Sequence, residues 1–214
     1  EPIIVNAVKP VTDFKFDKDA CLYDHIYVYY GSETGRGLRM ATLLISDFGS
    51  SATGPIPLDS LPDLLKENVE KPSLVVVVTS TLGSGRAPFT AKNYVDSMRK
   101  VPNNSVQNID FAVLALGNSA YTENFATFAQ KVEKSLKKAG CNPAMGMQIA
   151  DDLKDPEASF GDFRKMLLDE AAGTLYKSAE QGMDPEPPNE AQLVTMTFEG
   201  CIPVLQRQTV EVLG

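Results

Sequence analysis

The sequence predicts a three-layer α/β sandwich, in which a five-stranded parallel sheet of order 2-1-3-4-5 lies between two layers of helices. Two observations predict this class. Apolar runs without alternation, "SLVVVVTS" at 73–80 and "IDFAVLALG" at 109–117, are typical of strands that are covered on both faces. Segments with helical periodicity follow the strands in turn, and such alternation favours a parallel sheet with right-handed crossovers.

The predicted elements follow one another in the order βαβαβαβαβα. Strands are expected at 25–30, around residue 56, at 73–80, at 109–117 and at 145–152, and helices at 38–48, from about residue 60, at 89–100, at 124–140 and at 156–178. The Pro-rich composition of 53–65 limits the second strand to a short edge strand. The first helix is expected to pack on the sheet through one face, formed by Leu38, Ala41, Leu44 and Ile45.

The chain divides into three predicted parts. Residues 1–23 have no sustained period and are expected to form an N-terminal extension or linker, and residues 24–180 form the α/β domain. Residues 181–214 begin with an acidic, Pro-rich linker and continue into a C-terminal extension with two β segments, at 193–200 and 204–213. Because the chain does not begin with Met, we expect it to be part of a longer protein.

Composition disfavours several classes of protein. A net charge of −8 disfavours binding to nucleic acid, and no apolar run approaches the ~20 residues that span a bilayer. The N-terminus lacks the pattern of a signal peptide, so a cytoplasmic protein is expected. The cysteines, Cys21, Cys141 and Cys201, are expected to be reduced thiols, not disulfides or metal ligands. The single histidine, His25, is expected at a strand edge, so catalysis that depends on histidine is disfavoured.

The first predicted strand ends in "GSETGRG" at 31–37, directly before a helix. Unpaired backbone amides and the helix dipole favour an anion there, and Ser32 and Thr34 add hydroxyl donors. The segment lacks the Lys of the nucleotide P-loop and does not match G-x-G-x-x-G. A single phosphate monoester is therefore expected, and the alternative for this loop taken alone is a turn that only reverses the chain.

Two further loops follow the central strand and the fourth strand, "TSTLGSGRAP" at 79–88 and "LGNSAYTENF" at 116–125. Gly83 and Gly85 allow main-chain groups to face a ligand. Tyr121 offers a flat surface for stacking, and the alternative is that it caps the core. A phosphate at one loop and planar contacts at two others, without a catalytic acid–base set, predict a site for flavin mononucleotide (FMN).

On these three loops, the sequence resembles the flavodoxin-like FMN domains of the diflavin reductase family, such as those of the sulfite reductase flavoprotein and the nitric oxide synthase reductase region. The resemblance covers roughly 25–178 and depends on "GSETGRG", "VVVVTSTLGSGRAPFTAKNYV" and "LALGNSAYTENFATFAQKVEKSLKKAG". It implies that FMN is bound by the three loops and by "ADDLKDPEASF", where Asp151 or Asp152 would lie near the ring unless this segment is a solvated acidic turn. The implied FMN-binding residues are Ser32, Glu33, Thr34, Gly35, Arg36, Gly37, Thr79, Ser80, Thr81, Leu82, Gly83, Gly85, Leu116, Gly117, Asn118, Tyr121, Asn124, Phe125 and Asp151.

The resemblance also implies a function. Such a domain receives single electrons from FAD in a partner domain that oxidises NADPH, and passes them to a haem or similar acceptor with a basic face. The FAD- and NADPH-binding domain is expected elsewhere in the same full-length polypeptide, so this chain alone is not expected to oxidise NADPH.

Three residues depart from the family pattern and keep an alternative open. Leu82 stands where the family has an aromatic residue, Arg86 where it has Asp, and Gly37 where it has a small hydroxyl or methyl residue. The alternative is a flavodoxin-like domain that has lost FMN and serves as a structural or protein-interaction module. A free-standing flavodoxin, or a hydrolase on the same scaffold, is disfavoured by the extensions and by the missing nucleophile–His arrangement.

Overall fold

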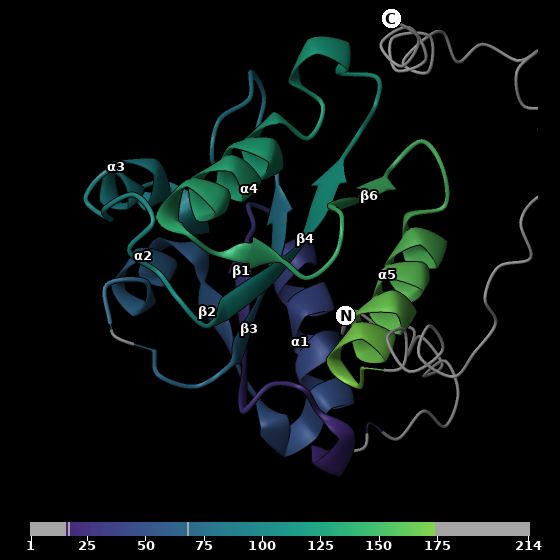
Figure 1. The fold of residues 1–214 in the computed structure, drawn as a ribbon. Helices are drawn as coiled ribbons and strands as arrows, with labels where there is room; N and C mark the ends of the chain where they lie inside the picture. The colour runs from purple at the N-terminus through teal and green to yellow at the C-terminus, as the bar shows by residue number, and fades with distance from the viewer. Residues whose placement is uncertain (1–15, 17, 68, 174–214) are drawn as a thin grey trace, which may run out of the picture. The chain divides into compact units, whose positions relative to one another are not determined.

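A computed structural model describes residues 16, 18–67 and 69–173 and confirms the predicted α/β class (Figure 1). The sheet is parallel, with the order β2-β1-β3-β4 and with both β5 and β6 paired to β4. Its strands are β1 (His25–Gly31), β2 (Ala52–Pro57), β3 (Ser73–Ser80), β4 (Ile109–Gly117), β5 (Asn142–Pro143) and β6 (Gln148–Asp151). The predicted strand order is confirmed, and two short strands share the fifth position.

The central strand β3 fixes the register of the sheet. Val76 is paired with Val28 on β1 and with Ala112 on β4. Because successive side chains of a strand point to opposite faces, Val75 joins the hydrophobic core on one face and Val76 joins the core on the other. The unbroken apolar run in the sequence is therefore explained by burial on both faces.

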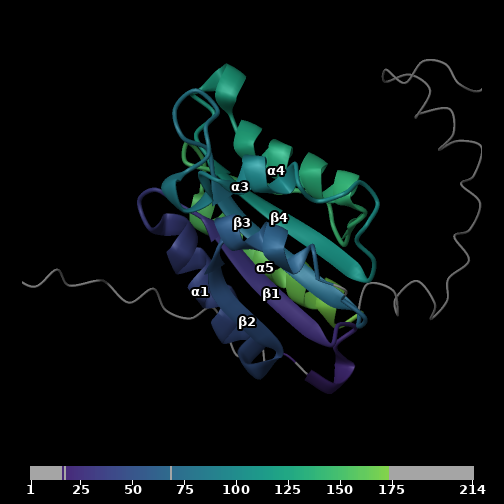
Figure 2. The ribbon, with the colours of Figure 1, turned by 90° about the vertical axis from the view of Figure 1, so that its left-hand side faces the viewer.

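Helices cover both faces of the sheet (Figure 2). One face packs against α1 (Arg36–Phe48) and α5 (Pro156–Ala171), and the other against α2 (Leu61–Leu64), α3 (Tyr94–Met98) and α4 (Thr127–Ala139). Short 3-10 turns connect these elements at Lys18–Ala20, Gly49–Ser51, Leu58–Ser60, Phe89–Ala91 and Thr122–Asn124. This layering places the loops after β1, β3 and β4 at the carboxyl edge of the sheet.

Two predicted helices were too long. The helix expected at 89–100 is a 3-10 turn followed by the short α3, because the amide of Asn93 donates to the carboxylate of Asp59 (2.8 Å) and cannot continue a helix from residue 89. Helix α4 begins at Thr127 instead of residue 124, because Ala126 adopts a left-handed conformation with φ 56°.

The ends of two other elements also differ from the prediction. Helix α5 ends at Ala171, before the expected residue 178, and residues from 174 onward lie outside the described part. Strand β2 has six residues, longer than the short edge strand expected from its prolines. It pairs with β1 across a register shift between Tyr27 and Tyr29.

The sheet-facing side of α1 was only partly predicted. Leu38 was expected there but is exposed, and Ile45 is partly buried. The buried face is formed by Met40, Ala41, Leu44 and Phe48. Apolar residues lie on more than one side of this helix, so periodicity alone did not decide which side packs on the sheet.

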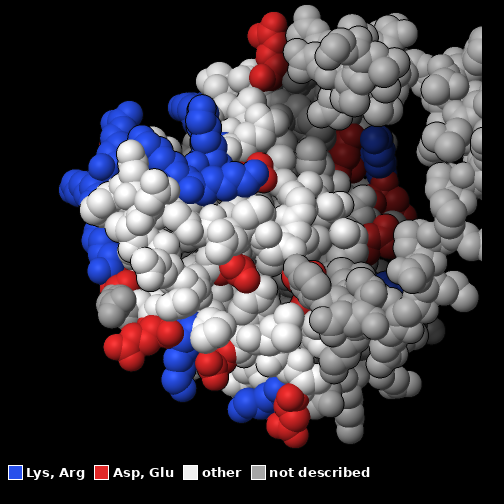
Figure 3. All heavy atoms as spheres, viewed as in Figure 1, with Lys and Arg blue, Asp and Glu red and all other residues white. Residues whose placement is uncertain are grey.

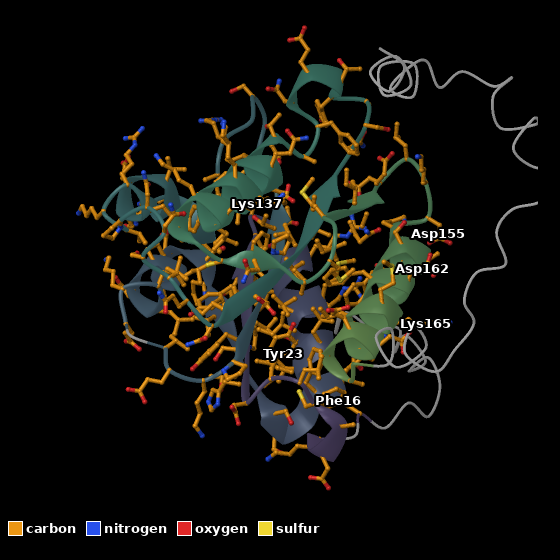
Figure 4. The ribbon with its side chains drawn as sticks, in the orientation of Figure 1. Phe16, Tyr23, Lys137, Asp155, Asp162 and Lys165 are labelled. Carbon is orange, nitrogen blue, oxygen red and sulfur yellow. The ribbon has the colours of Figure 1, made fainter. Side chains whose placement is uncertain are left out.

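The end of the expected N-terminal extension contacts the domain (Figure 4). Tyr23 is buried, and its hydroxyl donates to Asp110 (3.1 Å). The ring of Phe16 packs edge-on against Phe48 with centroids 5.0 Å apart. The boundaries at 23/24 and 180/181 stay predictions.

Within the residues that the structure describes, no helix is long and apolar enough to cross a lipid bilayer. Cys21 and Cys141 are free thiols. Cys201 and the β segments predicted at 193–200 and 204–213 lie outside the described residues.

Candidate functional site

The loops after β1, β3 and β4 meet at the carboxyl edge of the sheet. One cleft, of about 240 Å³, lies between the loops after β3 and β4, and a second, of about 180 Å³, lies between these loops and the start of α1. The two clefts adjoin, because they share the lining residues Thr81, Gly117, Asn118 and Tyr121. The three loops predicted to hold one ligand therefore lie together in space.

Most of the predicted site residues line these two clefts: Ser32, Thr34, Arg36, Gly37, Ser80, Thr81, Leu82, Gly83, Leu116, Gly117, Asn118, Tyr121, Asn124 and Phe125. The five other predicted residues line neither cleft: Glu33, Gly35, Thr79, Gly85 and Asp151. Two residues outside the predicted set also line the clefts, Ala126 and Asp152. No sequence signal pointed to Ala126, whereas Asp152 was the second acidic residue considered in its segment.

The hydroxyl of Ser32 organises the loop after β1. It accepts hydrogen bonds from the amides of Gly35 (3.0 Å) and Gly37 (3.2 Å), while the amide of Ser32 donates to the hydroxyl of Thr90 (2.8 Å). Gly35 has φ 87°, a conformation that favours glycine. Gly35 thus shapes the loop without lining the cleft.

The start of α1 has backbone donors that are unpaired among the residues described. Among the described residues, no acceptor is found for the backbone amides of Thr34 and Arg36. The first turn of α1 contains no acidic residue, and the side chain of Arg36 forms an ion pair with Asp152 at the smaller cleft. Free amides at the positive end of a helix dipole are suited to binding an anion.

The loop after β3 closes into a tight turn. Leu82 and Arg86 exchange two backbone hydrogen bonds of 2.9 Å, and Gly83 and Gly85 have φ values of 49° and 82°. A Cβ atom on Gly85 would lie 2.7 Å from the hydroxyl oxygen of Thr127, so only glycine lets this turn pack against α4. Leu82 and Gly83 are left facing the larger cleft.

Two of the predicted residues that miss the clefts lie in contact with a neighbouring segment. Thr79 is completely buried, and a Cβ atom on Gly31 would lie 2.2 Å from its hydroxyl oxygen. The carboxylate of Glu33 accepts a hydrogen bond from the amide of Phe89 (2.8 Å), which ties the loop after β1 to the loop after β3.

Asp151 supports the loop after β4 from within the structure. It is buried, and its carboxylate accepts hydrogen bonds from the amides of Ser119 (3.0 Å) and Leu153 (3.2 Å). The hydrogen bond from Ser119 lowers the pKa of Asp151 below its ordinary value, so this carboxylate stabilises the fold above its ordinary pKa and less so as the pH falls. Tyr121, in the loop that Asp151 supports, is 66% exposed and lines both clefts.

Comparisons with known proteins match this architecture. The model of the flavodoxin family matches residues 28–165. Over 156 residues the chain is 30% identical to NADPH-dependent diflavin oxidoreductase 1 of Candida albicans, covering 71% of this chain and 26% of that protein. Over 168 residues it is 29% identical to the inducible nitric oxide synthase of Gallus gallus, covering 78% of this chain and 14% of that protein.

A third relative is the sulfite reductase [NADPH] flavoprotein alpha-component of Photobacterium profundum, 28% identical over 148 residues, which cover 69% of this chain and 24% of that protein. The chain thus spans about a quarter or less of the length of these three relatives.

Solved structures show the same fold. A mutant flavodoxin from Pseudomonas aeruginosa superimposes with a TM-score of 0.56 at 24% identity, covering 69% of this chain and 98% of that one. A short-chain flavodoxin associated with a bacterial microcompartment gives a TM-score of 0.54 at 19% identity, covering 70% of this chain and 97% of that one. The predicted resemblance is confirmed, and the match over residues 28–165 shows that this chain belongs to the flavodoxin family.

Proposed function

We propose that this chain is the FMN-binding electron-transfer domain of a larger NADPH-dependent diflavin oxidoreductase. One observation carries the proposal: two adjoining clefts, built from the three loops at the carboxyl edge of the sheet, lie beside amides at the start of α1 that have no acceptor among the described residues. Membership of the flavodoxin family supports it, as does similarity to the diflavin oxidoreductase of Candida albicans and the sulfite reductase flavoprotein of Photobacterium profundum.

The chemistry of the clefts fits FMN. Thr34 and Arg36 offer amides that are free within the described part of the chain, and their side chains add a hydroxyl and a cation for a phosphate. Leu82, Gly83 and Tyr121 line the larger cleft with apolar and aromatic surface suited to a planar ring. Each cleft is smaller than the roughly 300–1,000 Å³ of typical small-molecule sites, so a ligand of that size would occupy both.

When bound, FMN would supply the one-electron chemistry, and the protein would orient it and adjust its potential. Tyr121 would cover the ring on the side of the loop after β4. Gly83, with φ 49° and no side chain, leaves the main chain of its turn able to approach the ring from the other side. Arg36 and the amides beside it would hold the phosphate end.

The proposed partners follow from this role. A FAD- and NADPH-binding domain of the same full-length polypeptide would deliver electrons, and a haem or similar centre with a basic face would accept them. The net charge of −8 favours fast encounter with such a face. This chain alone would not oxidise NADPH, and its free thiols are consistent with a cytoplasmic protein.

Titration of the purified chain with FMN, followed by visible absorbance and by quenching of flavin fluorescence, tests the proposal. We expect saturable binding, and we expect Tyr121→Ala to raise the Kd about 2- to 10-fold through loss of stacking. Phe89→Ala is a matched control, because Phe89 is exposed and lies outside both clefts. Equal weakening by both substitutions would contradict the placement of the ring.

A flavodoxin-like domain that has lost FMN is the second candidate. It is favoured by the hydroxyl of Ser32, which already accepts hydrogen bonds from the amides of Gly35 and Gly37. It is also favoured by Leu82, which is not aromatic although it lies where a ring is expected to stack on the flavin. A purified chain that is colourless, and that does not quench the fluorescence of added FMN, would establish this second candidate and reject the first.

A further inference from the structure

Basic residues of the described chain gather on one side of the molecule. The segments 86–100 and 127–140 contain eight Lys and Arg residues and two acidic residues, although the whole chain has a net charge of −8. The other described residues contain eight basic and seventeen acidic residues. Figure 3 shows the basic side chains gathered over α3 and α4. This side therefore has the opposite charge to the rest of the domain.

Most of these cations have no acidic partner among the described residues. Arg99 pairs with Asp96 (2.7 Å), and Lys137 pairs with Glu133 (2.8 Å). No carboxylate of the described residues lies within 4.0 Å of the six remaining basic groups, Arg86, Lys92, Lys100, Lys131, Lys134 and Lys138. Within the part of the chain that the structure describes, the positive charge of this face is thus largely not neutralised by ion pairs.

A groove of about 210 Å³ lies between α3 and α4 on this face. Arg99, Lys131 and Lys138 contribute its basic lining. Val95, which is 38% exposed, and Met98 contribute apolar surface to the same groove. The groove thus combines an apolar interior with a cationic border.

The size and chemistry of the groove select one class of occupant. Its volume is below the roughly 300–1,000 Å³ of sites for cofactor-sized molecules, and suits a single large side chain. Single-stranded nucleic acid is usually bound by stacking on exposed aromatic rings. The aromatic residue that lines this groove, Tyr94, is buried, and its hydroxyl hydrogen-bonds with that of Ser135 (2.8 Å). An acidic protein segment with one apolar anchor fits both the border and the interior.

We propose that the groove between α3 and α4 is a docking surface for an acidic segment of a partner protein, which inserts one large apolar side chain against Val95 and Met98. The site lies outside the clefts proposed for FMN and needs no flavin. It would allow the domain to bind an acidic partner by one side while its acidic surface remains free for a basic acceptor.

Nitrogen-15 NMR of the full chain, without added flavin, tests this docking surface. The probe is a short synthetic peptide of Asp and Glu residues with one central Leu, and the matched peptide has Gly in place of Leu. We expect chemical-shift changes concentrated on α3 and α4, and binding of the Leu peptide about tenfold tighter than that of the Gly peptide. Equal affinities, or changes spread over the whole surface, would reject the apolar anchor.

Charge reversal on α4 provides a second test, at Lys138, which lines the groove, and at Lys134 on the same helix, which does not. We expect the double variant Lys134→Glu/Lys138→Glu to bind the Leu peptide about tenfold more weakly, and added salt to weaken binding to the parent chain. The control Lys71→Glu/Lys165→Glu makes the same change at two exposed lysines outside the basic segments, and should stay within about twofold of the parent. A melting curve for each variant checks folding, and Lys134→Gln/Lys138→Gln replaces the reversal if it does not fold.

Two other occupants would overturn the proposal. Tighter binding of a single-stranded oligonucleotide than of the Leu peptide at equal salt would assign the groove to nucleic acid. Sedimentation of the chain alone that shows self-association, lost in Lys134→Glu/Lys138→Glu, would assign it to a second copy of the chain.

Discussion

Arg36, in the first turn of α1, forms an ion pair with Asp152, which directly follows β6. Both side chains line the smaller cleft, next to the amides of Thr34 and Arg36, for which the described structure shows no acceptor. The two side chains are 28% and 41% exposed, so the pair contributes only about 0–1 kcal/mol to the free energy of unfolding. Its larger effect concerns anion binding, because Asp152 neutralises the cation that lies closest to the proposed phosphate position.

Asp152→Asn should therefore strengthen phosphate binding. Removal of the carboxylate releases Arg36 and removes a negative charge, so we expect the Kd for FMN to fall about 3- to 10-fold, while the Kd for riboflavin, which lacks the phosphate, stays unchanged. Fluorescence titration with both flavins measures the ratio of the Kd for FMN to the Kd for riboflavin. Asp162→Asn, which removes the same charge from an exposed position on α5, serves as the control (Figure 4). An unchanged ratio in Asp152→Asn would place the phosphate elsewhere.

Leu82→Tyr should tighten FMN binding about 2- to 10-fold, because an aromatic ring at the larger cleft would stack on the flavin. The backbone hydrogen bonds between Leu82 and Arg86 do not involve the side chain, so the turn should keep its shape. Met166→Tyr adds the same ring on α5, away from the clefts, and should leave the Kd unchanged. A Kd that is the same in Leu82→Tyr and in the parent chain would show that this side chain does not face the ring.

Arg86→Asp should lower the reduction potential of bound FMN. A Cβ atom on Gly83 would lie 3.7 Å from a guanidinium nitrogen of Arg86, so this cation lies close to the lining of the larger cleft. Exchange of a positive for a negative charge there disfavours added electrons, and we expect a shift on the order of 50 mV, about tenfold in the one-electron equilibrium constant. Spectroelectrochemical titration measures it, with Lys71→Asp as an equal charge change outside the clefts. Equal potentials in Arg86→Asp and Lys71→Asp would assign the effect to total charge.

The strand order and the meeting of the three loops could be predicted because they depend on local signals. A run such as "SLVVVVTS" is typical of a strand buried on both faces, and β3 occupies that position. Once the sheet is parallel, the loops that contain Ser32, Gly83 and Tyr121 must leave the same edge. The positions of these residues in the clefts follow from topology more than from their own side chains.

The remaining details depend on contacts between distant segments. Asp151 and Asp152 are adjacent and chemically alike, and the amide of Ser119 decides which of them turns inward. Likewise, α3 is shortened by the hydrogen bond from Asn93 to Asp59, 34 residues earlier. Neither contact leaves a periodic signal in the sequence, so tertiary structure overrides the local prediction.

Glu170→Gln should stabilise the protein at neutral pH. Glu170 is buried on α5, and burial, followed by the negative charge of Asp110, raises the pKa of its carboxyl above the ordinary value of 4.5. A raised pKa in the folded state means that the protonated form favours folding below pH 4.5, and that this stability is lost as the pH rises through the raised pKa. Glutamine has nearly the same shape and stays neutral, so we expect a higher Tm at pH 7 and no gain below pH 4.5.

Thermal melts between pH 4 and 8 measure this difference between Glu170→Gln and the parent chain. Glu123→Gln is the control, because Glu123 is exposed and its carboxylate stays in contact with water in the folded state. A gain in Tm that is the same at every pH would assign the effect to packing. A loss at pH 7 would show that the ionised carboxylate makes a stabilising contact that glutamine cannot replace, and that burial does not dominate at this position.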